Sequence, residues 1–307
     1  MAATKTASPT MPVTAIDLDL ATPHTGMPAD FIPLQYHANM LTDAHRMDSF
    51  AAAIAAVVRP GMHVLDLGAG TGVLSFFAAR QGAVVTAVER EPGVLAAARS
   101  ALSASVGDRV TLVHGDARAY LPSEPVDVVL CEMMHVGQLR EKQIEVIGGF
   151  RDRYAAAGLG RMPRFLPEAC LQAVQPVEQD FTFHGYTVAA PYFQDPFCAQ
   201  PRTRPLASPE VWQQFCYDES TPSTCTADVG FRAEHSGRLN AVRLVTKNVL
   251  AVDPATGRTV DWLMNYLVVP LRRPVTVAAG DPVRVRFSYR PGDEISALMD
   301  DVHVVAG

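Results

Sequence analysis

The chain has 307 residues, of which 48% are hydrophobic and 19% are charged, so it can bury a sizeable core and bulk disorder is excluded. The formal net charge of −6 argues against nucleic-acid binding, which needs a dense cationic face. The five cysteines form no CxxC pair, which favours reduced thiols and no metal site. With no apolar run long enough to span a bilayer and no signal-peptide pattern, we expect a cytoplasmic protein without a membrane partner.

The first half of the chain alternates between helical and strand patterns. After a loose N-terminus over residues 1–24, an Ala-rich helix is predicted over residues 38–58, and Pro60-Gly61 stops it. Strands are then predicted over residues 63–68, 83–89, 110–116 and 126–132. Helices are predicted between the first three of them, over residues 73–82 and 92–105. This alternation predicts βαβ units and a mostly parallel, Rossmann-like sheet with helices on both faces over residues 25–163.

From residue 164 to residue 307 the pattern changes to prolines, turns and short alternating strands. Strands are predicted over residues 170–177, 238–252, 262–271 and 283–290. This half is therefore interpreted as an antiparallel β-barrel or sandwich. The segment 185–213 is rich in proline and aromatic residues and has no clear period, and we interpret it as an inserted arm.

A glycine turn, VLDLGAGTGVL over residues 64–74, follows the first strand and lets a ligand approach the backbone and the helix N-terminus. Its glycines are Gly68, Gly70 and Gly72, so the third comes one residue earlier than in the dinucleotide fingerprint. Asp66, two residues before the first glycine, would repel a pyrophosphate but suits a cofactor that carries an ammonium and a sulfonium. The turn therefore favours S-adenosylmethionine (SAM) over a nicotinamide cofactor.

Acids also end the next two predicted strands. Glu89 ends the second strand, where an acid commonly binds both ribose hydroxyls. Asp116 ends the third strand, at a position suited to the adenine amino group. Because open α/β sheets bind ligands at the carboxyl ends of their strands, the acids at all three ends together favour a methyltransferase.

The strand over residues 126–132 runs directly into an acid, Glu132, and Glu141 follows 141 − 132 = 9 residues later. Buried strands seldom end in an acid for packing reasons, because an ionised carboxylate is costly to desolvate. Taken alone, Glu141 fits a solvated helix acid, but its spacing from Glu132 favours a pair. His135 between them is either a structural histidine or a general base, and Met133 and Met134 are expected to line a pocket.

At these residues the sequence resembles the protein arginine methyltransferases, over roughly residues 31–300. VLDLGAGTGVLSFFAARQGA and VTAVE resemble the family's cofactor region, residues 37–54 its N-terminal helix, and CEMMHVGQLRE its double-glutamate loop. FLPEACLQAV and residues 260–285 resemble strands of its β-barrel. The resemblance implies a class I methyltransferase fold with a C-terminal barrel, SAM as methyl donor with S-adenosylhomocysteine as product, and a homodimer formed through an arm.

The resemblance also implies roles for individual residues. Arg46 would bind the cofactor carboxylate and Met40 would pack near the sulfonium, with His37 on the same pattern. Glu132 and Glu141 would be the catalytic pair, gripping a guanidinium through charge-assisted hydrogen bonds. The acceptor pocket would be lined by Asp43, Met134, His135, Asp261 and Trp262.

The acceptor side departs from the family pattern. The family's Thr-His-Trp loop is Val260-Asp261-Trp262 here, while the histidine's usual partner is kept as Asp43. The paired tyrosines upstream of the N-terminal helix are missing, with Phe31 near one of their positions. If Asp43 and Asp261 lie together, they need a shared proton or a cation, such as the ammonium of an amino-acid acceptor.

The leading hypothesis is a SAM-dependent N-methyltransferase that acts on a guanidino nitrogen of arginine or of an arginine-like small molecule. The departures favour a small molecule, and a peptide acceptor stays open. The alternatives are N- or O-methylation of an unrelated amine-bearing metabolite, and a silent SAM-binding scaffold.

Overall fold

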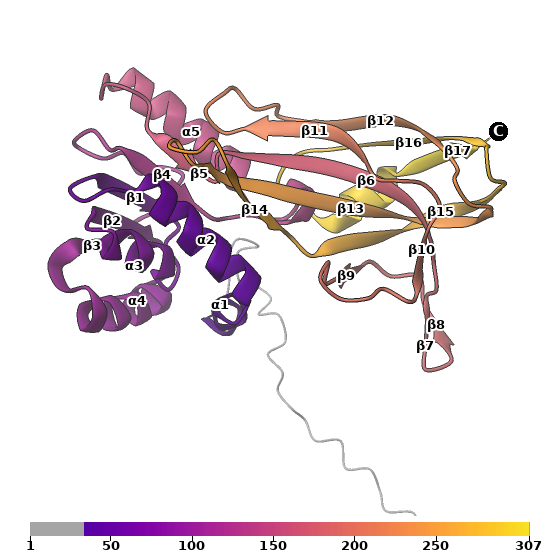
Figure 1. The fold of residues 1–307 in the computed structure, drawn as a ribbon, viewed down its shortest axis with the longest axis horizontal. Coiled ribbons are helices and arrows are strands. Elements are labelled where there is room, and N and C mark those ends of the chain that lie inside the picture. Colours follow the sequence, from indigo (N-terminus) through magenta and orange to yellow (C-terminus); the bar gives the residue numbers. More distant parts are fainter. Residues whose placement is uncertain (1–33, 307) are drawn as a thin grey trace, which may run out of the picture. The chain divides into compact units, whose positions relative to one another are not determined.

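The computed structural model describes residues 34–306, which belong to one compact unit (Figure 1). The N-terminus expected to be loose over residues 1–24 and Phe31 both lie outside the described residues. In Figure 1 the parallel sheet and its helices run from indigo to magenta, and the long antiparallel strands run from pink to yellow.

The first half forms a five-stranded parallel sheet with the strand order β3-β2-β1-β4-β5. Its strands are β1 His63–Leu67, β2 Val84–Glu89, β3 Val110–His114, β4 Val128–Cys131 and β5 Arg164–Leu166. Its helices after β1 are α3 Val73–Arg80, α4 Pro92–Ser105 and α5 Gln143–Ala156, with a short turn of 3-10 helix, η1, at Gly107–Arg109. The predicted Rossmann-like sheet is confirmed.

Both faces of this sheet are covered, as its apolar strands require. Successive residues of a strand point to opposite faces, and Val64 packs into a core with α2 and α3 whereas Leu65 packs into a core with α5. All four residues of β4 are buried. The continuous apolar run that precedes Glu132 therefore follows from burial on both sides.

Two helices precede the sheet where one was predicted over residues 38–58. They are α1 Leu34–Leu41 and α2 Ala44–Val57. The break comes at Asp43, whose extended backbone and side-chain oxygen make it the N-cap of α2, with the Oδ1 atom accepting the amide N–H of Arg46 at 3.0 Å. The prediction missed the break because the apolar spacing continues across it.

The second half is antiparallel. A seven-stranded sheet is built on the order β10-β6-β13-β15-β9, with β11 on β6 and β14 on β13; a second sheet has the order β12-β16-β17, and β7 and β8 form a hairpin. The strands are β6 Ala169–Gln179, β7 Thr182–Phe183, β8 Tyr186–Thr187, β9 Tyr192–Gln194, β10 Thr203–Pro205, β11 Glu210–Cys216, β12 Cys225–Arg232, β13 Gly237–Val252, β14 Thr259–Leu263, β15 Tyr266–Val277, β16 Pro282–Tyr289 and β17 His303–Ala306, with helix α6 Ile295–Asp301 before β17. The single strand predicted over residues 262–271 is wrong, because the chain turns between β14 and β15.

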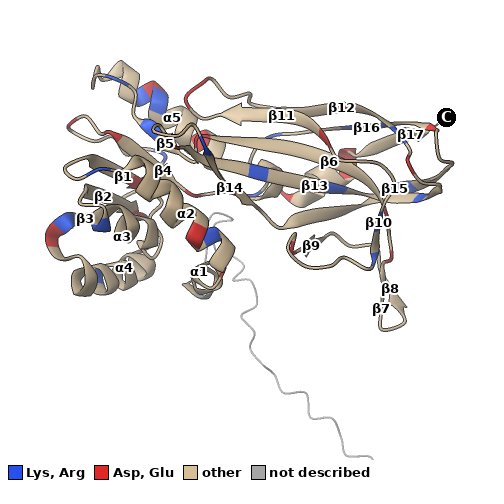
Figure 2. Cartoon of the chain, viewed as in Figure 1, with Lys and Arg blue, Asp and Glu red and all other residues tan. Residues whose placement is uncertain are grey.

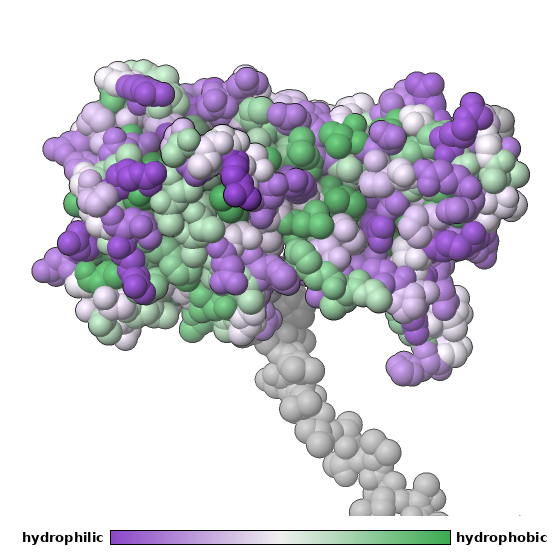
Figure 3. Space-filling model, viewed as in Figure 1, coloured by the Kyte–Doolittle hydropathy of each residue, from purple (hydrophilic) through white to green (hydrophobic). Residues whose placement is uncertain are grey.

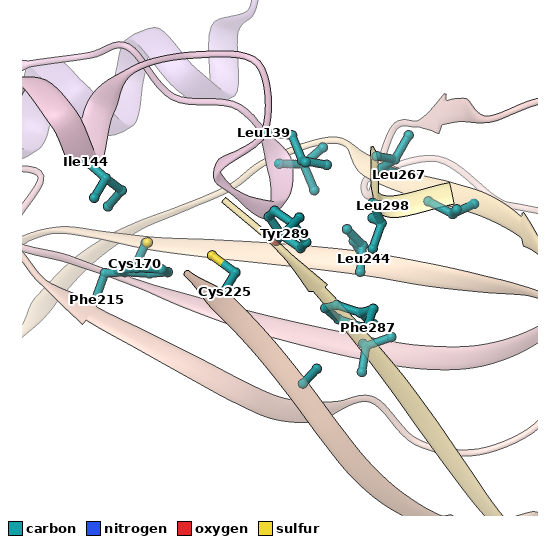
Figure 4. Close-up of a cluster of buried hydrophobic side chains, with 14 of the residues drawn as sticks. Leu139, Ile144, Cys170, Phe215, Cys225, Leu244, Leu267, Phe287, Tyr289 and Leu298 are labelled. Carbon is teal, nitrogen blue, oxygen red and sulfur yellow. The ribbon is translucent and has the colours of Figure 1, made fainter. Parts of the chain in front are cut away.

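The two halves share one hydrophobic core. Leu65 of β1 and Ile147 of α5 belong to the same buried cluster as Leu244 of β13 and Phe287 of β16, and Figure 4 shows part of this cluster. In addition, β5 joins the parallel sheet just past residue 163. The predicted domain boundary between residues 163 and 164 therefore remains an interpretation. The same holds for the closure of the antiparallel strands into a barrel.

The surface of the described residues has a mixed character. Basic and acidic residues are scattered over the ribbon in Figure 2, and hydrophilic and hydrophobic residues are interspersed over the face drawn in Figure 3. None of the helices in the described range is both long and apolar enough to cross a membrane.

The cap on α2 gives a stability prediction. Asp43→Ala removes the acceptor of the Arg46 amide, and we expect the free energy of unfolding in urea to fall by about 1 kcal/mol. Asp43→Asn keeps an acceptor oxygen and should cost much less. The matched control is Asp48→Ala, which changes an exposed acid further along the same helix. Equal stability of the Asp43→Ala and Asp48→Ala proteins would contradict the capping role.

Candidate active site

The carboxyl ends of β1, β2 and β3 meet at one edge of the parallel sheet, since these strands are adjacent and in register. Asp66 lies near the end of β1 and Glu89 ends β2. Asp116 follows β3 by two residues. The three acids predicted from the sequence are therefore placed at the edge where open α/β sheets bind ligands.

Asp66 is buried, with 1% of its surface exposed. Its Oδ2 atom accepts a hydrogen bond from the Ser75 hydroxyl of α3 at 2.6 Å. Burial raises the pKa of the Asp66 carboxyl to about 7, against the lowering effect of the Ser75 bonds. A nearby cation would shift Asp66 to its ionised form, which fits the expected ammonium or sulfonium partner.

Glu89 ties the glycine turn to β2. Its Oε2 atom accepts the N–H of Gly70 at 2.9 Å, and its Oε1 atom accepts the N–H of Glu91 at 2.7 Å. Gly68, Gly70 and Gly72 have φ angles of 74°, 57° and 81°, in the region that favours glycine. The backbone conformation of the turn therefore explains all three glycines.

Two side chains approach the turn closely. A Cβ atom added to Gly70 would lie 2.9 Å from the imidazole ring of His37, and one added to Gly68 would collide with the side chain of Met133. His37 comes from α1 and Met133 follows Glu132, so the N-terminal helix and the double-glutamate loop both reach the cofactor edge. Met40 is half-buried on the same helix as His37.

Asp116 is held by an arginine that the sequence reading did not connect with it. Its carboxylate accepts hydrogen bonds from the backbone and the guanidinium of Arg118, the Nη2–Oδ2 distance being 2.7 Å. These bonds lower the pKa of Asp116. Contact with an adenine amino group therefore stays a prediction for this residue.

The donor and acceptor set at this edge fits SAM. A buried acid of raised pKa suits a cationic group, and a second acid on the neighbouring strand offers carboxylate oxygens to ribose hydroxyls. Glycines of positive φ shape the turn that leads into the N-terminus of α3. SAM would therefore be held by Asp66, Glu89 and the turn that contains Gly68 and Gly70.

Beside this edge, Arg46 and Glu132 form a buried ion pair between Nη2 and Oε2, with side chains 11% and 10% exposed. The guanidinium carbon of Arg46 also lies 5.0 Å from the centre of the Trp262 ring. Within the described chain, Nε of Arg46 and Oε1 of Glu132 are buried without a hydrogen-bond partner. Three predicted site residues are thus brought together, with hydrogen-bonding capacity still free.

Glu141 is the second acid of the loop and lies just before α5 rather than on it. Burial, followed by the charge of Glu132, raises its pKa to about 8. Burial also raises the pKa of Glu132, against the lowering effect of Arg46. The two glutamates therefore act on each other electrostatically in a desolvated site.

Tyr36 of α1 was not recognised from the sequence as a site residue. Although this residue is 47% exposed, partial burial raises the pKa of its hydroxyl, with a further rise from the charge of Glu141 against the lowering effect of Arg46. Its position directly before His37 is the one feature of the sequence that could have indicated its closeness to the two glutamates. Ser75 was also missed, although it is a polar residue on the otherwise apolar first turn of α3.

His135 is buried in the loop between the two glutamates. Its Nδ1 atom lies 3.0 Å from the carbonyl oxygen of Val136, and its ring meets the edge of Phe193 with ring centres 5.6 Å apart. Burial lowers its pKa to about 4. A neutral ring of such low basicity is poorly suited to general-base catalysis at neutral pH, and Met134 beside it packs into the core with α2.

The hypothesis that Asp43 and Asp261 share a cation gains no support. Asp261 pairs with Val249 and Trp262 with Asn248 in the β13–β14 register, so their side chains point to opposite faces. Trp262 packs towards α2. Asp261 forms an ion pair with Lys247 at 2.7 Å, so the chain itself supplies a cation to this acid.

Comparison with known proteins agrees with this geometry. Residues 64–151 match the sequence profile of a methyltransferase domain. An uncharacterised protein of Methanothermobacter thermautotrophicus is 31% identical over 264 residues, which cover 86% of this chain and 95% of that protein. Protein arginine N-methyltransferase 1 of Schizosaccharomyces pombe is 36% identical over 126 residues, which cover 39% of this chain and 36% of that protein.

The fold has a counterpart among solved structures. The Trypanosoma brucei PRMT1 enzyme–prozyme heterotetrameric complex with AdoHcy matches with a TM-score of 0.67 at 20% identity, covering 82% of this chain and 86% of that one. The match therefore extends over both halves of the fold, well beyond the methyltransferase domain. The chain is therefore a SAM-dependent methyltransferase whose fold matches that of a protein arginine methyltransferase.

Proposed function

We propose that this methyltransferase transfers the methyl group of SAM to a guanidino nitrogen of arginine or of an arginine-like small molecule. The observation that carries the proposal is the pair of buried acids, Glu132 and Glu141, beside the cofactor edge. Arg46 is the buried partner of Glu132, and the half-exposed Arg140 adds only a weaker favourable charge at Glu141, so a further cation would complete the charge compensation. A planar guanidinium can donate two parallel hydrogen bonds to a carboxylate, which a compact ammonium cannot do.

The acid pair would both bind and activate such an acceptor. A guanidinium is a weak nucleophile, because it is protonated at neutral pH and its lone pairs are delocalised. Carboxylates that accept N–H bonds from some of its nitrogens draw positive charge there and leave another nitrogen better able to attack. Glu132 and Glu141 would therefore orient this nitrogen as well as hold the cation.

SAM, when bound, supplies the methyl group on a sulfonium. Formation of the new N–C bond accompanies cleavage of the S–C bond, and the attacking nitrogen loses one proton, so the methylated acceptor keeps its single positive charge. An ionised Glu132 or Glu141 can accept that proton. His135 is less suited, since its pKa is lowered to about 4 by burial.

Two contacts within the chain support a small acceptor. Phe193 of β9 meets His135 of the loop, and Phe197 stacks on His45 of α2 with ring centres 3.8 Å apart. The segment after β8 thus packs against the loop between the two glutamates and against α2. If the acceptor lies beside this loop, these contacts would leave less room for a peptide than for a free amino acid or amine.

Methyl transfer from labelled SAM tests the proposal directly. We expect incorporation into free L-arginine or a related guanidino compound such as agmatine, and weaker incorporation into arginine-rich peptides. Glu132→Gln and Glu141→Gln should each lower kcat/KM by about a hundredfold or more, because each removes a charged hydrogen-bond acceptor from the transferring site. Binding of S-adenosylhomocysteine, measured by calorimetry, should change little in the Glu141→Gln protein.

The matched control is Glu145→Gln, which neutralises an exposed acid in the first turn of α5 and should leave turnover unchanged. Full turnover by Glu132→Gln with normal cofactor binding would contradict the catalytic role. Labelling of a nitrogen or hydroxyl of an unrelated amine-bearing metabolite, with no labelling of any guanidino compound, would favour the alternative acceptor class. If the protein binds S-adenosylhomocysteine but transfers no methyl group to any acceptor, a silent SAM-binding scaffold would be favoured.

The raised pKa of Glu141 gives a pH prediction. Below about pH 8 this acid carries a proton that a bound guanidinium must displace, so binding of the acceptor releases a proton. With S-adenosylhomocysteine saturating, affinity for agmatine should rise with pH by up to about tenfold per unit and level off above about pH 8. Calorimetry in buffers of different ionisation enthalpy measures the released proton.

Glu141→Gln provides the internal control for this prediction, since glutamine cannot titrate. The affinity of the Glu141→Gln protein for agmatine should be weaker than that of the wild type and should vary little over the same pH range. A wild-type affinity that is independent of pH, with no proton released, would show that Glu141 is already ionised or lies away from the acceptor.

We further propose a homodimer in which the segment 185–213 acts as an arm that contacts a second copy. Tyr186 of β8, at the start of this segment, is 71% exposed, a large value for an aromatic residue. Sedimentation velocity on the wild type and on Tyr186→Ser measures the mass, and a wild-type monomer at all concentrations would overturn the proposal.

A further inference from the structure

The loop between the two glutamates has an unusual backbone. Gly137 has a φ of 73°, and Gln138 and Arg140 have φ angles of 56° and 60°. Among the described residues other than glycine, only these two and His184 have positive φ values. Residues with side chains adopt this conformation at an energetic cost and keep it only when their surroundings impose it. Something must therefore hold the loop in place.

The antiparallel half holds Gly137 through both polar groups of its backbone. The Gly137 N–H donates to Oγ1 of Thr246 on β13 at 2.9 Å, and the Tyr289 hydroxyl of β16 donates to the Gly137 carbonyl at 2.5 Å. Thr246 in turn donates to Oε1 of Gln172 on β6 at 2.6 Å. Figure 4 shows Tyr289 beside Leu244 of β13, with Leu139 of the loop packed into the same cluster.

The strained residues after Gly137 are also bound to this half. The side-chain amide of Gln138 donates to the hydroxyl of Tyr217 at 3.2 Å. The backbone carbonyl of Gln138 accepts the Gly292 N–H at 2.7 Å. The N–H of Arg140 donates to the carbonyl of Asp293 at 2.8 Å. The backbone of residues 137–140 is thus fixed by strands and turns more than 70 residues away in sequence.

The first glutamate is fixed differently. Gln143 of α5 accepts the Met133 N–H at 2.9 Å and donates to the carbonyl of Cys131 at 2.7 Å. These bonds bracket Glu132 within the α/β half. Glu132 is therefore positioned by the parallel sheet and α5, whereas the approach to Glu141 is positioned by the antiparallel strands.

We infer that Thr246 and Tyr289 are positioning residues, which clamp Gly137 and so set the placement of Glu141 against Glu132 for the acceptor. Neither residue belongs to the cofactor edge, and both act through the loop backbone. This inference rests on the proposed function for its kinetic consequence. The clamp itself is a structural claim that can be tested without any acceptor.

Hydrogen exchange measured by mass spectrometry tests the clamp. In Thr246→Val and in Tyr289→Phe, peptides covering residues 133–141 should exchange about tenfold faster, as expected for the loss of one buried hydrogen bond. Peptides covering β1 and β2 should be unchanged. Thr226→Val, which alters an exposed hydroxyl of β12, is the matched control and should match the wild type throughout.

Kinetics test the consequence for the acceptor. Each clamp variant should lower kcat/KM for agmatine or L-arginine about tenfold or more, because small misplacements of catalytic groups are costly. The Kd for S-adenosylhomocysteine should stay within about twofold of the wild type. The pH at which acceptor affinity levels off should move down, since a looser loop admits water to Glu141.

Unchanged exchange of residues 133–141 in the Thr246→Val/Tyr289→Phe double variant would overturn the clamp. Equal acceleration of exchange in β1 and β2 would also overturn it, because the two residues would then support the whole fold. Unchanged kcat/KM and pH dependence would overturn their positioning role. A wild type that methylates no guanidino compound would overturn the proposed function, and the exchange data would still decide on the clamp.

Discussion

Two desolvated carboxylates, of which only Glu132 is paired with a buried arginine, are the constraint on which this site depends. Arg46 compensates the charge of Glu132 directly, and Glu141 must either hold a proton or face another cation. Burial and the charge of Glu132 raise the pKa of Glu141 to about 8, so the two options are closely balanced near neutral pH. Under the proposed function, this pair would act as a cation receptor that exchanges a proton for its ligand.

This constraint explains why the methyltransferase sheet is fused so closely to the antiparallel strands. A desolvated acid pair needs a dry and rigid surrounding, and the parallel sheet supplies this only around Glu132. The antiparallel half closes the other side through the shared core and through the bonds that hold the loop at Gly137. The loop between the two glutamates is thus held by both halves, while the cofactor edge belongs to the first half.

The sequence predicted the parts of the fold that follow from local patterns. The alternation of strands and helices and the acids at strand ends gave the parallel sheet and the cofactor edge. The break before α2 was missed because the apolar spacing continues across Asp43. The face on which Asp261 lies depends on the β13–β14 register, and the bonds at Gly137 join distant strands. Neither has a local signal in the sequence.

The most direct test of the account compares a guanidino compound with its neutral urea isostere. Protein saturated with S-adenosylhomocysteine would be titrated by calorimetry with L-arginine and with L-citrulline, and with agmatine and its carbamoyl counterpart. The account predicts that a guanidino compound binds at least about a hundredfold more tightly than its isostere, because only a cation balances the acid pair. Equal affinities within each pair would contradict it.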